Sequence, residues 1–589
     1  MSDPAKKSDV RIDVDLVAEQ FDALDSNTHR EALLEAIRSR DVYRKLTEDL
    51  REKVEKLEIG LSGPKSQRFK AEENGQLSLA ILAQLLGSDP PADADPKALA
   101  EQLAAEAEAE AEQAGDADDG KDDETGDPGA HRRPRKPTGR RTAGERIAKA
   151  TVEIVPDEVK RLGTDAFERI GEERSTTIER RVSSLVEVTV VRPKYKAKTQ
   201  EAILAVKESR AELGTLPEQE PESWITISAR PELPIEHGMA GPGLLANLIV
   251  RRFDDHLPYN RLENVYEREG MRLGRSTLYG WLDALRGLFA PLLEAMLMDA
   301  RTAPYVCTDA TGVLVQAPRK CSRGHFWVLV VPGRHVIFAF SRKHNAEAVD
   351  ELLGDYKGTV VADAHSVFDH LYGADGATEA GCWGHARAYY FKTLASEPEI
   401  AQEFLGNLQV MFLLERKFAS KSRKQRRQMR ATKAKPIVDN HFALCHKYED
   451  TALDGTPLAA AIRYSLNQEV ALRRFLTDGR LPATNNISER NLRRQAVGRK
   501  NWLFVGSDDG AEVNTTFATL VASCRLQGIE PEAYLRDVLT LLPRWPRKRV
   551  LELAPCNWKQ TREQPETQQR LEDDLFRSIM GELDVIHPD

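Results

Sequence analysis

From Pro304 to Val315 the chain reads PYVCTDATGVLV, and this apolar stretch begins the segment that decides the fold. Two more apolar stretches follow after turns that contain Gly or Pro: HFWVLVV (His325–Val331) and HVIFAFS (His335–Ser341). Together the three stretches predict consecutive antiparallel strands. GTVVAD (Gly358–Asp363) is a shorter apolar run between two helical segments, as is typical of a buried parallel strand.

The segments around this fourth strand complete an α/β pattern. Asn345–Leu353 and Ser366–Tyr372 are predicted helices, and Glu379–Trp383 is a candidate fifth strand. Three strands, a helix, a strand, a helix and a strand form the order of an RNase H-like core, in which the first strand lies beside the parallel fourth strand. We therefore predict a mixed five-stranded sheet with helices, followed by a long helical and basic insertion before Asn485.

Two acidic residues fall at informative places on these strands. Asp309 lies on the first strand and Asp363 at the carboxyl end of the fourth. Carboxylates on neighbouring strands can bridge divalent ions that activate a nucleophile and stabilise a leaving oxygen in phosphoryl transfer. Mg²⁺ suits such a site because it prefers a few carboxylates together with water and substrate phosphate. Glu489 is the candidate third ligand, near the start of a helix capped by Asn485.

Longer sequence motifs in and around this region carry a family resemblance. They are VCTDATGV (306–313), VVADAHSVFDHLY (360–372), CWGHARAYYF (382–391), DGRLPATNNISERNLRRQAVGRKNWLFVGSDDGAE (478–512) and LQGIEPEAYLRDVL (526–539). With these motifs the chain resembles the insertion-sequence-66 family of bacterial transposases, which are DDE-type recombinases. The resemblance covers most of the chain and is most specific between Ala303 and Trp558.

The resemblance implies a set of catalytic residues and a reaction. Asp309, Asp363 and Glu489 are implied as catalytic residues and as ligands of Mg²⁺, for which Mn²⁺ can substitute. Separately from the resemblance, we expect His385 to lie close to the active site as a support that orients a phosphate or a carboxylate. The implied enzyme binds the terminal inverted repeats of its element, cleaves DNA strands, and joins the freed 3′-OH to target DNA. A catalytically silent DNA-binding protein derived from a transposase and an RNase H-like nuclease without strand transfer are the alternatives.

The sequence departs from the family pattern at two places. The family usually has a CxxC…CxxC zinc module, whereas residues 145–235 contain no cysteine, so we expect a small domain without zinc. Ala310 stands where the family commonly has Glu directly after the first Asp. An alternative zinc site would need two distant segments to meet in space. Its four ligands would be Cys321, His325, Cys382 and His385.

Charge is distributed very unevenly along the chain, although the net charge is only −9. Asp93–Asp127 holds 14 acidic residues and two lysines, so the rest of the chain carries +3. Basic residues gather in His131–Arg141, Arg416–Lys435 and Arg490–Lys500, which favours a polyanion such as double-stranded DNA; solvated surfaces are the alternative for any one cluster. The predicted DNA-binding residues are Arg132, Arg133, Arg135, Lys136, Arg140, Arg141, Arg490, Arg494, Arg499 and Lys500.

The chain divides into regions of distinct composition. Residues 239–302 contain three helical segments, the third opening at Arg275 with Ser276 and Thr277 as cap candidates, which fits either a helix-turn-helix or a plain packing unit. The six predicted regions are a helical and coiled-coil region (1–87), a disordered acidic then basic linker (88–144), a small domain replacing the zinc module (145–238), the helix-turn-helix-like region (239–302), an RNase H-like catalytic domain (303–512) with a helical insertion at about 392–480, and a helical region (513–589).

Composition and assembly complete the expectations. The six cysteines include no CxxC pair, which excludes a disulfide scaffold, and no apolar run reaches the length of a membrane helix. We therefore expect a cytoplasmic, nucleoid-associated bacterial protein without a membrane partner. Transposition joins two element ends, so we expect a dimer or higher oligomer on DNA, with Leu50–Leu61 as a candidate self-association seam. The family resemblance adds small accessory proteins of the same element as potential partners.

Overall fold

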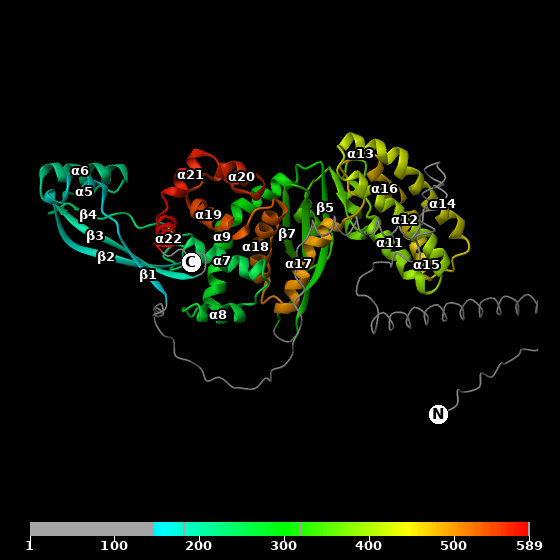
Figure 1. Ribbon diagram of the computed structural model, residues 1–589, viewed down its shortest axis with the longest axis horizontal. Coiled ribbons are helices and arrows are strands. Elements are labelled where there is room, and N and C mark those ends of the chain that lie inside the picture. Colours follow the sequence, from blue (N-terminus) through cyan, green and yellow to red (C-terminus); the bar gives the residue numbers. More distant parts are fainter. Residues whose placement is uncertain (1–146, 181–183, 218, 318–319, 587–589) are drawn as a thin grey trace, which may run out of the picture. The chain divides into compact units, whose positions relative to one another are not determined.

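The computed structural model describes residues 147–180, 184–217, 219–317 and 320–586 (Figure 1). The predicted coiled-coil region (1–87) and the linker (88–144), with all six predicted basic residues of its arm, lie outside the described residues. The described residues form two compact units, which we treat separately. One unit is Ala380–Thr484, and the other comprises the residues up to Glu379 together with those from Asn485 onward.

A mixed five-stranded sheet forms the centre of the larger unit. Its strand order is β7-β6-β5-β8-β9, with β5, β6 and β7 antiparallel and β5 parallel to β8. The four strands predicted from the apolar stretches are confirmed. The fifth is shorter than predicted, because helix α11 already begins at Trp383. The strands are β5 (Tyr305–Val315), β6 (Ser322–Val331), β7 (His335–Ser341), β8 (Thr359–Val361) and β9 (Thr378–Ala380).

Apolar side chains bury both faces of this sheet. Val360 and Val361 of β8 are fully buried, as the prediction of a buried parallel strand required. Helix α10 (Ala346–Leu353) covers part of the sheet with Val349 and Leu352, and the side chain of Asn345 caps the helix by accepting the Ala348 N–H. The segment predicted as a second helix is a 3₁₀-helix, Ser366–Leu371.

Helix α18 (Asp508–Leu526) covers the edge strand β7 of this sheet. The Thr519 hydroxyl accepts the Phe338 N–H at 2.9 Å. The Ser523 hydroxyl accepts the Val336 N–H and donates to the Val336 carbonyl, both at 3.0 Å. These side chains satisfy backbone groups that an edge strand would otherwise leave unpaired, so the sheet is closed at this edge.

The three helices predicted within 239–302 are all present. They are α7 (Pro242–Phe253), α8 (Tyr259–Arg268) and α9 (Arg275–Ala300). The cap prediction for α9 is wrong: the helix follows Gly274 without a side-chain cap, and Ser276 and Thr277 lie inside its first turn. Apolar residues of α9, from Leu278 to Met296, are buried along its whole length at helical spacing. This helix therefore belongs to the core, and the helix-turn-helix reading stays a prediction.

The cysteine-free segment folds as a small sheet with two helices. Its longest strand pair joins Phe167–Arg180 to Leu185–Ala197. Val186, Val188 and Val190 pack against the C-terminal helix α22 (Leu575–Ile586). The strand order is β1-β3-β2, with β4 beside β3. The elements are β1 (Ala148–Glu153), α5 (Asp157–Leu162), β2 (Phe167–Arg180), β3 (Leu185–Ala197), α6 (Gln200–Glu212) and β4 (Ile225–Thr226).

The unit Ala380–Thr484 is helical, as predicted for the insertion, and has an aromatic core. Burial lowers the pKa of His441 to about 3, and its ring packs edge-on to Trp383 and Tyr390. Arg430 is buried within the basic stretch and is held by Glu415. The helices are α11 (Trp383–Lys392), α12 (Pro398–Phe418), α13 (Arg423–Met429), α14 (Lys435–Glu449), α15 (Pro457–Asn467) and α16 (Glu469–Arg473).

The remaining helices all belong to the larger unit. Helix α19 packs on α7. Within the described ranges, no helix is both long enough and apolar enough to cross a membrane. These helices are α17 (Asn486–Trp502), α19 (Pro531–Leu541), α20 (Pro555–Arg562) and α21 (Pro565–Glu572).

Candidate active site

Strands β5 and β8 carry the first two acidic residues to the same end of the sheet. Their parallel register pairs Val306 with Val360 and Cys307 with Val361. Asp309 follows two residues after Cys307, and Asp363 follows two residues after Val361. The register thus places both carboxyl groups at the carboxyl end of the β5–β8 pair.

The chain turns sharply immediately after Asp363. Ala364 has a φ of 61°, in the left-handed region that residues other than glycine rarely adopt. The turn brings the backbone N–H of His365 to the Asp363 carboxylate, to which it donates at 3.2 Å. A local hydrogen bond therefore orients the second carboxylate.

Glu489 reaches the sheet through the residue that precedes its helix. Asn485 is fully buried, and its side-chain amide donates to the carbonyl of Thr308 at 2.8 Å. Thr308 directly precedes Asp309, so this hydrogen bond attaches the start of α17 to β5 beside the first carboxylate. Asn485 stands at the N-cap position of α17, as predicted, but its side chain makes no capping hydrogen bond.

Electrostatics identify the three carboxylates as one group. Burial, together with the negative charges of Asp363 and Glu489, raises the pKa of Asp309 to about 7, against the lowering effect of the Ala310 N–H. That N–H donates to the Asp309 carboxylate at 2.7 Å. A bound divalent cation would reduce the mutual repulsion among neighbouring carboxylates. The three acidic side chains therefore fit the Mg²⁺ site predicted from the sequence.

A cluster of histidines lies beside Asp363. The His344 ring stacks on Trp327 with centroids 4.8 Å apart, and His325 and His365 lie 5.0 and 4.5 Å from it. Burial lowers the pKa of His344, and the charge of Asp363 opposes this. The sequence pattern did not predict His344 or His365 as site residues. The position of His365, two residues after a predicted active-site aspartate, was the one available signal, whereas nothing local marks His344.

The predicted basic residues of α17 differ in their exposure and in their partners. Arg494 contacts Asp254 at 2.6 Å, and Asp254 also pairs with Arg525, so Arg494 is held against the protein body. Arg490 and Lys500 are exposed. Burial lowers the pKa of Arg499, which is partly covered.

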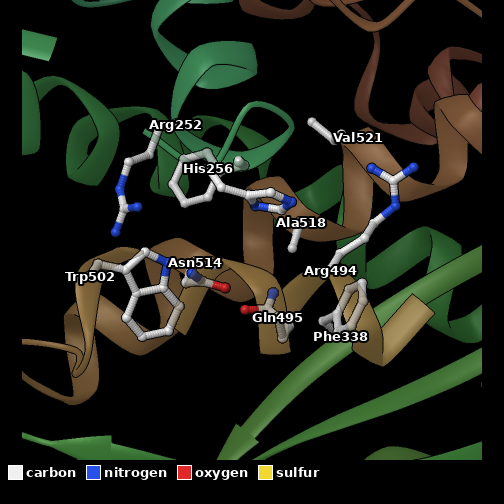
Figure 2. A pocket seen from close by; sticks show the side chains of 11 residues that line it. Arg252, His256, Phe338, Arg494, Gln495, Trp502, Asn514, Ala518 and Val521 are labelled. Atoms are coloured by element: carbon white, nitrogen blue, oxygen red, sulfur yellow. The ribbon is translucent and has the colours of Figure 1, made fainter. Parts of the chain in front are cut away.

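A small pocket lies behind α17, between that helix, α7 and α18 (Figure 2). The Arg252 guanidinium lies over the face of the Trp502 ring, 5.7 Å from the ring centre. Gly498 makes this packing feasible, because a Cβ there would lie 2.7 Å from Nε1 of Trp502. The cavity measures about 10 Å³, close to the size that holds one water molecule, so it is a packing feature and not a nucleotide site.

The remaining candidates lie away from this trio in sequence. Cys321 directly precedes β6, and His325 lies on that strand. Cys382 is buried and His385 lies on α11, both in the unit Ala380–Thr484. Both the support role of His385 and the four-ligand zinc alternative stay predictions.

A mixed sheet that gathers three carboxylates beside two parallel strands is typical of enzymes that perform phosphoryl transfer with divalent cations. The sequence profile of the Transposase IS66 family matches residues 237–513, and that of the IS66 C-terminal element matches residues 519–556. The chain belongs to the IS66 transposase family. The small domain with strands β1 to β3 lies outside both matched segments.

Three relatives come from Sinorhizobium fredii and carry the name of uncharacterised proteins. The relative y4qI is 30% identical over 344 residues, which cover 55% of this chain and 64% of the relative. The relative y4hP is 30% identical over 349 residues, covering 55% and 63%, and y4jD is 27% identical over 358 residues, covering 57% and 70%. The match thus spans less than two thirds of the length of the first two relatives.

Proposed function

We propose that this protein is a DDE-type DNA transposase with an RNase H-like catalytic core. The observation that carries the proposal is geometric: the parallel β5–β8 register carries Asp309 and Asp363 beyond the same end of the strand pair, and the Asn485–Thr308 hydrogen bond attaches the start of the Glu489 helix there. Membership of the IS66 transposase family supports it independently. The strand order β7-β6-β5-β8-β9, with only β5 and β8 shown parallel, supports the RNase H-like assignment.

Each of the three acidic side chains has a defined task in this proposal. Asp309, Asp363 and Glu489 would hold Mg²⁺ or Mn²⁺, which when bound supplies Lewis acidity to the nucleophile and to the leaving oxygen. The Ala310 N–H orients Asp309, and the His365 N–H orients Asp363. Asn485 holds the start of α17, and with it Glu489, beside β5. All three carboxylates act in their deprotonated form.

The reaction we propose has two phosphoryl-transfer steps. Water first attacks the phosphodiester at an end of the element and releases a 3′-OH. The 3′-OH then attacks a phosphodiester of the target duplex, forming the new P–O bond and releasing the target's own 3′-oxygen. The terminal inverted repeats and the target DNA are the proposed partners. A dimer or higher oligomer on DNA and accessory proteins of the same element extend this proposal.

Strand cleavage and strand transfer by the purified chain test this function. The variants Asp309→Asn, Asp363→Asn and Glu489→Gln keep side-chain volume and remove charge, so each should abolish both steps with Mg²⁺ while still binding the duplex. Asp355→Asn is the matched control, because Asp355 is an exposed acid at the loop before β8. Cleavage at the wild-type rate by any of the three variants would contradict the assignment, and cleavage without joining would identify a nuclease.

A further inference from the structure

One face of helix α17 is exposed along its whole length, and Glu489 lies at its beginning. The opposite face is buried through Ser488, Leu492, Gln495 and Gly498. The spacing of three or four residues places every exposed side chain on a single stripe. The exposed stripe consists of Asn486, Glu489, Arg490, Arg493, Val497 and Lys500, and continues into Leu503 and Phe504.

Three cations on this stripe form no ion pair with the residues that the structure describes. Within the described part of the chain, Arg490, Arg493 and Lys500 have no acidic side chain within ion-pair distance. Arg494, one residue off the stripe, is paired with Asp254 at 2.6 Å. One arginine therefore attaches the helix to the protein body. The three other cations face solvent on the same stripe as Glu489, the proposed catalytic glutamate.

The stripe ends in an apolar tip whose backbone is hydrogen-bonded to the end of α17 and to β5. Leu503 is 65% exposed and has a φ of 63°, an unfavourable conformation for a branched residue. Phe504, 39% exposed, donates its N–H to the Trp502 carbonyl at 2.8 Å. The next residue, Val505, donates to the carbonyl of Leu314 on β5 at 2.9 Å.

Both sides of this tip are anchored to the core. On one side the Trp502 ring lies against Arg252 (Figure 2), and on the other Val505 forms a bridge with Val315. Leu314, which is 48% exposed, adds a third apolar side chain from the neighbouring strand. The contacts of Trp502 and Val505 hold Leu503 in its strained backbone conformation. In this conformation the apolar side chains of the tip face solvent.

We propose that the exposed stripe of α17 is a track for duplex DNA, and that Leu503 and Phe504 form a wedge that enters a base step. The inference rests on the proposed function, because Glu489 at the start of the stripe fixes where the scissile phosphate lies. Arginine and lysine side chains suit backbone phosphates, and exposed apolar side chains flanked by cations suit partial unstacking of bases. No protein partner is needed to explain the exposed apolar tip.

The length of α17 gives the wedge a position on the DNA. Leu503 follows Glu489 by 14 residues, which corresponds to about 20 Å at the helical rise. This distance equals about six base-pair steps of B-DNA. Unstacking should therefore occur within about six base pairs of the cleavage site.

The salt dependence of DNA binding tests the track. Removing one cation that binds a phosphate should reduce the slope of log affinity against log salt by about 0.9. Arg493→Ala should show this reduction, whereas the matched control Arg494→Ala should keep the wild-type slope, because its guanidinium contacts Asp254 and not DNA. The probe is a duplex carrying the terminal inverted repeat, bound without a divalent cation. A wild-type slope for Arg493→Ala, or the same reduced slope for both variants, would overturn the proposal.

A fluorescent adenine analogue, whose emission rises when it unstacks, tests the wedge. In the Asp309→Asn background, which keeps the duplex whole, emission should rise at a step near the end of the repeat, and Phe504→Ala should remove the rise without changing the salt slope. Val470→Ala is the control, since Val470 is 72% exposed on α16. Unstacking that persists in Phe504→Ala, or that is absent with Phe504 intact, would overturn the wedge. Neither assay depends on cleavage, so failure of the proposed function is separately visible.

Discussion

At the scale of single residues, Asp309 shows how a group of neighbouring carboxylates affects the stability of its own fold. Its carboxyl is buried beside two other carboxylates, and its pKa lies at about 7 instead of 3.8. The raised value means that the folded state favours the protonated form. The contribution of Asp309 to the free energy of unfolding is therefore complete below about pH 3.8, where its carboxyl is protonated in both states. This contribution is lost as the pH rises through about 7, where the buried carboxyl ionises.

Asp309→Asn should therefore stabilise the cation-free protein at alkaline pH. Above about pH 7 the variant should unfold at a higher temperature than the wild type, because it removes a buried negative charge beside Asp363 and Glu489. Near pH 4 the two proteins should unfold at similar temperatures. Thermal unfolding followed by circular dichroism in chelator across this range measures the difference, with Asp355→Asn as the reference. A variant that is less stable at alkaline pH would contradict the electrostatic grouping.

At the scale of elements, α17 is positioned by long-range contacts that the local sequence pattern does not predict. The sequence pattern at Asn485 indicated an N-cap, but its side chain bonds to Thr308, 177 residues earlier in the chain. The strand β2 was not predicted from the sequence, for a different reason. Its sequence FERIGEERSTTIER is polar because an edge strand with solvent-exposed faces needs few apolar residues. Apolar runs such as that of β8, by contrast, were sufficient to predict the buried strands.

Removing the Asn485 amide should uncouple Glu489 from the sheet. Asn485→Ala leaves the buried Thr308 carbonyl without this donor, which should cost about 1–3 kcal/mol of stability, and it should slow strand cleavage. Asn467→Ala is the matched control, because Asn467 is an exposed asparagine at the end of α15 and lies outside the α17 stripe. Equal effects of the two substitutions on cleavage and unfolding would show that Asn485 has no positioning role.

At the scale of the whole molecule, predictability follows the range of the determining interactions. The order of strands and the identities of Asp309 and Asp363 were accessible, because apolar periodicity and the parallel register are short-range properties of the sequence. Glu489 was a candidate from its place near the start of a helix, but only the family resemblance made it specific, since the chain has 93 acidic residues. The histidine cluster and the exposed stripe of α17 needed the packed structure, because burial decides which face of a helix remains open.

The central claim is that Asp309, Asp363 and Glu489 together hold a divalent cation, and calorimetric titration with Mn²⁺ tests it most directly. At a pH above about 7, where Asp309 is ionised, the wild type and the Asp355→Asn control should bind Mn²⁺ alike. Each of Asp309→Asn, Asp363→Asn and Glu489→Gln should weaken binding by about tenfold or more, since loss of even supporting groups has effects of that size. Binding to the acidic stretch 93–127 is common to all five proteins, so it cancels in the comparison. Equal Mn²⁺ affinity in all five proteins would contradict the account.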